Sequence, residues 1–434
     1  MQHIRSKIAN FSWLSAEQGI RLVVGLITTT LVARRLGADG YAAFAYVFGV
    51  AAIAVPLGRF GLDAIILRRV SAAPENARLT VSSAAILSLM ASMAGAGLAI
   101  AIVAASGGPP GVSWELMAFA ALTIVGVPGE IPSLYLKAKE QVGLISAIRT
   151  AIAVIIGAVI CIAALSDASL ETLVLLRGAE AVFLALAGAA AVWMVKPQSR
   201  LMVPSAASIA GMAKAGLPLM IAGLATVAYM RIDQIMLGHM APAAELGVYS
   251  IAVRISEVSN LLPFVLQSTL YAAIVRNYVR DPLSFDQYMQ RIYDLFALAA
   301  WPTMFAIGLG TYFLLVPVFG PEYAGALPMV LLLLLGLPLF FLYYAWGTML
   351  TVREWMWTAP LVAGFGAMVN IALNFALISP FGGSGAAAAT TISYAAASIG
   401  GSLFIPKLRG TAAGMIRALD PFHASKRLLA IYRQ

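Results

Sequence analysis

Five arginines interrupt long apolar runs of the chain, where a charged side chain is costly. A charge in the hydrocarbon core of a membrane costs roughly 2.5 kcal/mol or more, so such residues usually face a bundle interior or a water-filled cavity. A guanidinium group presents a planar fork of donors that binds two phosphate oxygens at once. We therefore predict a shared cavity that holds a large, phosphate-bearing anion. The five candidates are Arg21, Arg59, Arg177, Arg231 and Arg254.

Acidic residues stand at helical spacing from four of these arginines. A separation of three or four residues places two side chains on one face of a helix. The alternative to a shared cavity is therefore a set of internal ion pairs with a structural role only. The pairs are Glu17–Arg21, Arg59–Asp63, Arg177–Glu180 and Arg254–Glu257.

The stretch YMRIDQIMLG breaks this pattern, because Arg231 and Asp233 lie only two residues apart. Residues at that spacing point about 200° away from each other around a helix. Asp233 and Arg254 are expected at similar depth on consecutive spans, so we hypothesise that these two residues pair. Arg231 then faces the cavity.

Three acids are candidates for coupling transport to protons, because a carboxyl group in a cavity can be protonated. They are Asp233, Glu257 and Glu130. Glu130 lies between two prolines in the stretch VPGEIP, which predicts a kink near the inner end of a span.

Two asparagines, Asn370 and Asn374, lie four residues apart and so share one helix face. Hydrogen bonding between helices is one role for them, and polar lining of the cavity is the other. We predict no metal site and no cofactor, because the chain has a single cysteine, Cys161, and three widely spaced histidines.

The composition excludes a soluble protein. The 434 residues are 61% hydrophobic and 11% charged, against about 45–50% and about 25% in soluble domains. The net charge is +9, but the cations lie in loops and are not interleaved with aromatics, so we predict no nucleic-acid partner. Apolar runs of about 20 residues predict an all-α polytopic membrane protein. Its twelve transmembrane helices are expected near residues 17–35, 41–66, 80–105, 115–136, 143–165, 170–195, 213–238, 245–275, 288–317, 326–350, 358–378 and 384–405.

The predicted helices divide into two six-helix bundles, at residues 1–195 and 213–405. A cytoplasmic linker at 196–212 joins them, and a basic amphipathic tail follows at 406–434. Lysines and arginines concentrate in alternate connections, which predicts that both termini are cytoplasmic. The tail mixes cations with leucine, isoleucine and aromatics, so we expect it to lie on membrane lipids, with binding of a specific partner as the alternative.

Four short stretches resemble the polysaccharide flippases of the multidrug/oligosaccharidyl-lipid/polysaccharide (MOP) superfamily. They are LVARRLGADGYAAFAY, RIDQIMLG, GVYSIAVRISE and GLDAIILRRVS, with Ala42 standing where a glycine is usual. The resemblance implies two bundles around a central cavity that opens alternately to each side. It implies a substrate of oligosaccharide linked to polyprenyl diphosphate, with Arg21, Asp233 and Arg254 as the best cavity candidates.

The resulting expectation is a flippase of the bacterial inner membrane, and not an enzyme. It serves O-antigen, capsule or exopolysaccharide synthesis, with a polymerase and a chain-length regulator as possible partners. Two alternatives remain open. A cation-coupled multidrug antiporter requires an acidic cavity, whereas this chain places five arginines in its spans. A membrane-embedded oligosaccharide polymerase or ligase requires a large outer loop, whereas the outer loops here are short.

Overall fold

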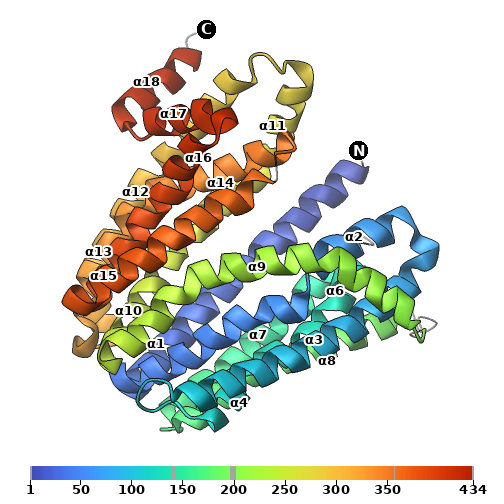
Figure 1. Cartoon of the computed structure of the whole chain (residues 1–434), viewed down its shortest axis with the longest axis vertical. Helices are drawn as coiled ribbons and strands as arrows, with labels where there is room; N and C mark the ends of the chain where they lie inside the picture. The colour runs from blue at the N-terminus through green and yellow to red at the C-terminus, as the bar shows by residue number, and fades with distance from the viewer. Residues whose placement is uncertain (1, 139–141, 196–201, 356, 433–434) are drawn as a thin grey trace. The chain divides into compact units, whose positions relative to one another are not determined.

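The computed structural model describes residues 2–138, 142–195, 202–355 and 357–432, and helices joined by short turns make up this part of the chain (Figure 1). A helix satisfies its backbone hydrogen bonds internally, and this is required in the hydrocarbon core of a membrane, where water is absent. The chain divides into two compact units, Met1–Arg231 and Ile232–Gln434. The predicted linker lies partly outside the described residues, and from Ala206 onward it is helical.

Unit 1 is built from long apolar helices packed side by side. α1 packs along α7 and α3, and α8 packs against α5, α6 and α7. Two short 3₁₀ turns, Pro74–Asn76 and Val127–Gly129, connect neighbouring helices. The helices are α1 (Gln2–Arg59), α2 (Leu62–Ala72), α3 (Ala77–Ser106), α4 (Trp114–Ala120), α5 (Leu122–Val125), α6 (Glu130–Ala138), α7 (Val142–Leu165), α8 (Leu170–Val195) and α9 (Ala206–Met240), which crosses into unit 2.

Unit 2 repeats this kind of packing with α12 at its centre. α12 contacts α13 and α14 along its length, and near its start it contacts the two C-terminal helices, α17 and α18, drawn in red in Figure 1. Its helices are α10 (Ala243–Ser256), α11 (Leu261–Arg280), α12 (Phe285–Phe319), α13 (Ala326–Leu335), α14 (Leu337–Val352), α15 (Thr358–Ala395), α16 (Gly401–Phe404), α17 (Arg409–Ala418) and α18 (Pro421–Tyr432).

Glycines break the two longest helices where the sequence predicts loops between spans. Gly37 has φ 68° within α1, and Gly382 has φ 54° within α15. Only glycine adopts such left-handed angles without strain. The backbone N–H of Gly383 donates to Glu245 Oε2 at 2.9 Å, which holds this break against the start of α10.

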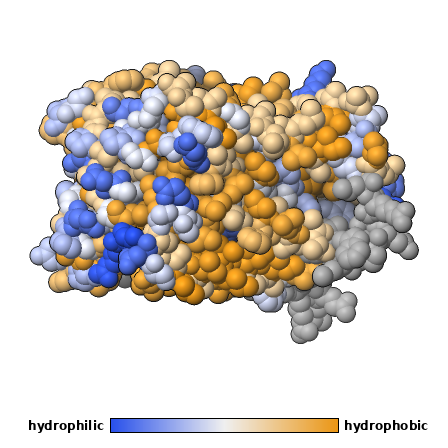
Figure 2. All heavy atoms as spheres, turned by 90° about the horizontal axis from the view of Figure 1, so that it is seen from below, coloured by the Kyte–Doolittle hydropathy of each residue, from blue (hydrophilic) through white to orange (hydrophobic). Residues whose placement is uncertain are grey.

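By length and composition, the described residues contain nine candidate membrane spans, or ten when α13 and α14, which are bent by 42°, count as one. Large apolar side chains on these helices are exposed, including Met90, Ile155 and Phe305. Figure 2 shows one face on which hydrophobic residues form a broad surface, with hydrophilic residues gathered toward one end. Such a surface is stable in lipid and not in water, so the chain is a multi-pass helical membrane protein.

Candidate functional site

Charged side chains from three helices meet inside unit 1. Arg149 Nε on α7 lies 3.0 Å from Glu17 Oε1 on α1. Arg21 Nη2, also on α1, lies 3.9 Å from Glu180 Oε1 on α8. Arg177, one turn before Glu180, contacts the other oxygen of that carboxylate. Two carboxylates therefore hold three guanidinium groups that the sequence places far apart. We call these five residues the unit 1 cluster.

The carboxylates of the unit 1 cluster are more deeply buried than the arginines. The Glu17 and Glu180 side chains are both 9% exposed, whereas those of Arg149, Arg21 and Arg177 are 21%, 29% and 41% exposed. Arg21 Nη1 is buried and has no hydrogen-bond partner among the described residues. The accessible face of the cluster is therefore cationic, and one buried donor of Arg21 remains unused.

A second ion pair lies close to this cluster, between the end of α1 and the start of α6. Arg59 Nη2 lies 3.0 Å from Glu130 Oε2 and donates a hydrogen bond to Oε1 at 3.3 Å. Both residues line a small hollow of about 150 Å³, which Arg149 and Ser133 also line. The hollow therefore connects the Arg59–Glu130 pair with the unit 1 cluster through Arg149.

The stretch VPGEIP positions Glu130 by close packing. It forms the 3₁₀ turn Val127–Gly129 before α6, and this turn lies directly on α8. A Cβ at Gly129 would lie 2.0 Å from atoms of Ala185. Only glycine lets the two backbones approach so closely, which brings Glu130 next to α8 and the hollow.

The structure confirms two of the predicted local pairs. Arg177 pairs with Glu180, and Arg254 Nη1 lies 3.3 Å from Glu257 Oε2 at the end of α10. In the other two predicted pairs, the structure shows residues that contact partners on different helices. Glu17 contacts Arg149, Arg21 contacts Glu180, and Arg59 contacts Glu130.

Sequence reasoning did not include Arg149 among the charges within spans, although it lies in the predicted helix 143–165. The structure places it within the candidate span Gly143–Leu165. A signal was available, because Arg149 stands in an apolar stretch with no acid within four residues on either side. An arginine in that position needs a carboxylate from another helix.

Asp233 is the centre of a buried polar contact in unit 2. Tyr249 Oη on α10 donates to Asp233 Oδ2 at 2.5 Å, and Thr390 Oγ1 on α15 donates to the same oxygen at 3.4 Å. The backbone N–H of Gln234 donates to Oδ1 at 2.8 Å. This carboxylate therefore joins three helices, while its hypothesised pairing with Arg254 stays a prediction.

The remaining candidates lie elsewhere in the two units. Asn370 and Asn374 are buried, and Asn374 Nδ2 donates to Asn370 Oδ1 at 3.0 Å along α15. The shared face of these asparagines is confirmed. Arg231 is half-buried on α9 and Asp63 is half-buried in the first turn of α2. The roles that the sequence predicts for these residues in a cavity stay predictions.

The charges of these two neighbouring groups favour an anionic ligand. The unit 1 cluster and the Arg59–Glu130 pair together hold Arg21, Arg59, Arg149 and Arg177 against Glu17, Glu130 and Glu180. Arginine forks in a site of low dielectric bind phosphate strongly. Among the residues that the structure describes, no group of three histidine, cysteine, aspartate or glutamate side chains is arranged to hold a metal ion.

Solved membrane transporters share this fold. The chain is 13% identical to the lipid II flippase MurJ in its inward closed conformation, with a TM-score of 0.73 over 93% of this chain and 90% of that one. It is 16% identical to an inward-facing multidrug resistance MATE family transporter of the MOP superfamily, with a TM-score of 0.66 over 91% and 95%. These likenesses show a MOP-superfamily fold.

A third similar structure is a MOP superfamily transporter from Pyrococcus furiosus, described as having a binding pocket of reverse polarity. The identity is 16% and the TM-score 0.62, over 95% of this chain and 96% of that one. No curated protein matches the sequence. A family model described as polysaccharide biosynthesis protein matches residues 8–278, more than half of the chain. The chain therefore belongs to the polysaccharide biosynthesis protein family.

Proposed function

We propose that this protein is a flippase that moves polyprenyl-diphosphate-linked oligosaccharide from the cytoplasmic to the outer leaflet of the bacterial inner membrane. The observation that carries the proposal is the unit 1 cluster, in which three arginines share two buried carboxylates inside candidate spans. Family membership and the fold shared with a lipid II flippase support it.

The proposed role of the unit 1 cluster is to hold the diphosphate. The buried carboxylates keep the guanidinium groups oriented and offset their charge while no substrate is bound. A diphosphate brings its own negative charge to the more exposed arginine face, where planar forks bind pairs of oxygens. Binding and release then require only that the arginines exchange one anionic partner for another, without a covalent step.

Twelve spans with both termini cytoplasmic belong to the same proposal. The candidate spans Ala16–Val70 and Thr358–Phe404 have 55 and 47 residues, or about 80 and 70 Å at the rise of a helix. The hydrocarbon core is about 30 Å thick. The glycine breaks at Gly37 and Gly382 support counting each stretch as two spans. The number of candidate spans then rises from ten to twelve.

Display of surface polysaccharide tests the transport role in cells. We expect Arg254→Ala and Asp233→Ala to abolish display in a strain that depends on this protein, while both variants still insert into the membrane. Polymer on the surface is measured by electrophoresis and staining, and membrane insertion by immunoblot. An Arg276→Ala variant, which changes an exposed cation at the end of α11, is the matched control. Normal display by both test variants argues against their assignment to the substrate path.

Two measurements discriminate the competing functions and the driving force. A multidrug antiporter binds lipophilic cations and not polyprenyl diphosphate sugars, and a polymerase or ligase transfers glycosyl groups when purified. If Asp233, Glu257 or Glu130 couples transport to protons, collapsing the proton gradient slows flipping in vesicles. An unchanged rate excludes that coupling while leaving the flippase proposal intact.

A further inference from the structure

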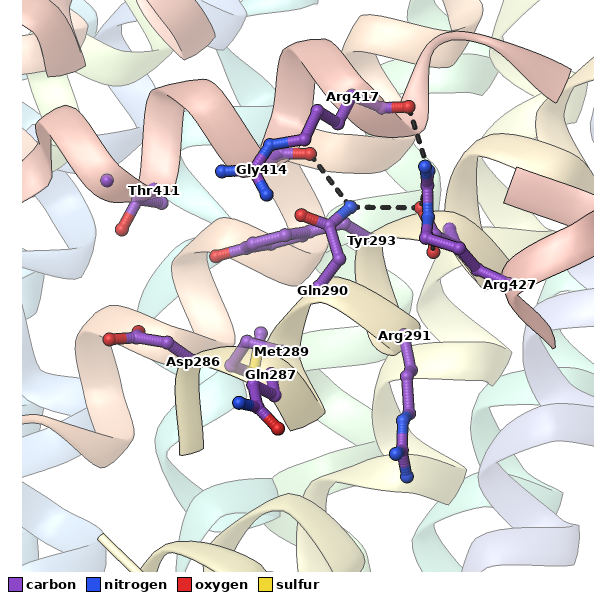
Figure 3. Close-up of a pocket in the computed structure, with 12 residues that line it drawn as sticks. Asp286, Gln287, Met289, Gln290, Arg291, Tyr293, Thr411, Gly414, Arg417 and Arg427 are labelled. Atoms are coloured by element: carbon purple, nitrogen blue, oxygen red, sulfur yellow. Dashed lines mark hydrogen bonds and ion pairs between the residues drawn. The ribbon is translucent and has the colours of Figure 1, made fainter. Parts of the chain in front are cut away.

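The C-terminal tail forms one wall of a cavity at the end of unit 2. The cavity has a volume of about 460 Å³ and lies between the start of α12 and the helices α17 and α18 (Figure 3). That volume is typical of small-molecule sites. α12 has 35 residues, while about 20 suffice to cross a membrane, and its first ten, FDQYMQRIYD, are largely polar. The cavity therefore lies beside the membrane and not within its core.

A buried ion pair fixes the tail to α12 and builds this cavity. Asp294 is fully buried, and Arg427 on α18 donates two hydrogen bonds to its oxygens at 2.8 and 2.7 Å. Gln290 Nε2 donates to Asp294 Oδ1 at 3.0 Å and to the carbonyl oxygen of Gly414 on α17 at 3.0 Å. The cavity wall is thus held by specific contacts and is not a chance gap between helices.

Both acids of the cavity already have cationic partners. Arg427 neutralises Asp294, and Arg353 Nη2 lies 2.6 Å from Asp286 Oδ1. Arg353 is itself held over the ring of Phe285 at 5.2 Å. By contrast, no carboxylate of the described residues lies within ion-pair distance of Arg417, which also lines the cavity. The cavity therefore carries an excess positive charge.

A buried hydroxyl group points to a ligand in the same cavity. Tyr293 is only 3% exposed, and its Oη has no hydrogen-bond partner among the described residues. Burying an unpaired hydroxyl is costly. In Figure 3 this hydroxyl and the guanidinium group of Arg417 extend toward the same side of the cavity, where Thr411 lies, whereas Arg291 extends away. The first turn of α17 at Gly410 and Thr411 also favours an anion.

We propose that this cavity binds the phosphate group of an anionic membrane lipid, held by Arg417 and the Tyr293 hydroxyl. A lipid is favoured over free phosphate because the same tail helices expose large apolar side chains beside their cations. Ile416, Phe422 and Leu429 are 49%, 78% and 61% exposed. Helices of that kind lie at the surface of anionic membranes. The site is separate from the unit 1 cluster, and the proposal does not depend on which substrate the protein transports.

The test uses the purified full chain in phosphatidylcholine nanodiscs, with thermal unfolding measured against added dioctanoyl phosphatidylglycerol. Arg417→Gln is the principal variant, because its side chain is exposed and forms no ion pair with the described residues. Lys426→Gln removes another exposed tail cation, which does not line the cavity. We expect Arg417→Gln to weaken the apparent lipid affinity roughly tenfold or more, the usual scale for a lost charge-assisted hydrogen bond. We expect Lys426→Gln to change it less than about twofold, as for an exposed charge.

Tyr293→Phe gives a second readout that a purely structural role does not predict. Removing an unpaired buried hydroxyl should raise the unfolding temperature of the lipid-free protein, and the same change should weaken its response to lipid. An unchanged lipid response in this variant contradicts the proposal. So does an equal loss in Arg417→Gln and Lys426→Gln, which indicates diffuse surface attraction. Equal protection by inorganic phosphate at matched concentration overturns the assignment to a lipid.

Discussion

At the scale of single residues, the contact between Glu17 and Arg149 is the most informative. The carboxylate is buried, and the arginine that neutralises it comes from another helix. Removing one partner of such a pair leaves an uncompensated charge in a buried site. We therefore regard this contact as the point where helix packing and substrate binding depend on the same side chains.

We expect Arg149→Gln to destabilise the protein by about 3 kcal/mol, because Glu17 then loses its cationic partner. Adding Glu17→Gln should restore part of that loss, since two neutral amides can share a hydrogen bond. Thermal unfolding of the two single variants and the double variant measures the coupling in a double-mutant cycle. Additive losses in the two single variants mean that the contact contributes nothing beyond each residue alone.

Sequence reasoning at this scale predicted two of the four pairs within helices correctly and missed the pairs between helices. Arg177–Glu180 and Arg254–Glu257 were predictable, because spacing along one helix fixes which side chains are neighbours. Glu17 and Arg149 are separated by most of unit 1 in sequence, and nothing in the spacing tells which helices pack together. The Tyr249–Asp233 contact was missed for the same reason. Tyr249 lies 16 residues after Asp233 on another helix, and only the fold places its hydroxyl on that carboxylate.

At the scale of elements, the C-terminal helix α18 shows how local chemistry defines a boundary. Asp420 precedes Pro421 at the first position of the helix, a residue order typical of helix N-termini. Asp420 Oδ1 accepts from the backbone N–H groups of Phe422 and His423 at 2.9 and 3.1 Å. The tail was expected to be amphipathic, but its division into two helices with an acidic cap was not predicted.

The cap predicts a pH dependence of α18. The backbone N–H of His423 and then its imidazole lower the pKa of Asp420 from its ordinary value. A lowered folded-state pKa means that the stabilisation is complete above the unfolded pKa, about 3.9, and is lost as the pH falls through the lower folded value. We expect α18 amides to lose protection from hydrogen exchange below about pH 4, after correction for intrinsic exchange rates. Asp420→Asn retains a good cap and should remove this dependence; an identical profile in that variant assigns the change to other groups.

Glycine breaks were harder to predict than the helices around them. The apolar runs indicate helix on both sides of Gly37 and of Gly382, and a loop was expected at each place. The structure instead has helix on both sides of one glycine of positive φ, so that a single residue departs from helical backbone angles. Apolar periodicity indicates the helices on either side but not the residue at which the backbone breaks.

At the scale of the whole molecule, the number of membrane crossings is testable at these breaks. In a Cys161→Ser background, we expect Asp39→Cys and Phe381→Cys to be labelled by an impermeant thiol reagent added outside the cell. Both residues are exposed and lie beside the glycine breaks. Lys407→Cys, at the predicted cytoplasmic side, should be labelled only after the membrane is opened. Labelling of Asp39→Cys from the cytoplasmic side contradicts the proposed orientation.

Much of the molecular architecture could be predicted from composition, because few backbone structures are stable in lipid. The all-helical, multi-pass character is confirmed, and the resemblance to the MOP superfamily is borne out by the shared fold and the family match. The chemistry was less accessible. Charges such as Arg21 and Arg59 revealed that polar sites exist within the spans, but their partners depend on helix packing that distance along the sequence does not encode.

Reconstituted transport tests the central claim most directly. Purified protein is incorporated into vesicles with a fluorescent polyprenyl-diphosphate disaccharide, and the fraction that reaches the opposite leaflet is measured by quenching. We predict flipping by the wild type and by the control Arg276→Gln. We predict at least a tenfold slower rate in Arg21→Gln, whose partly unsatisfied guanidinium group lies at the cationic face of the unit 1 cluster. Wild-type flipping by Arg21→Gln, with the protein fully folded, would contradict the proposal that this cluster holds the diphosphate.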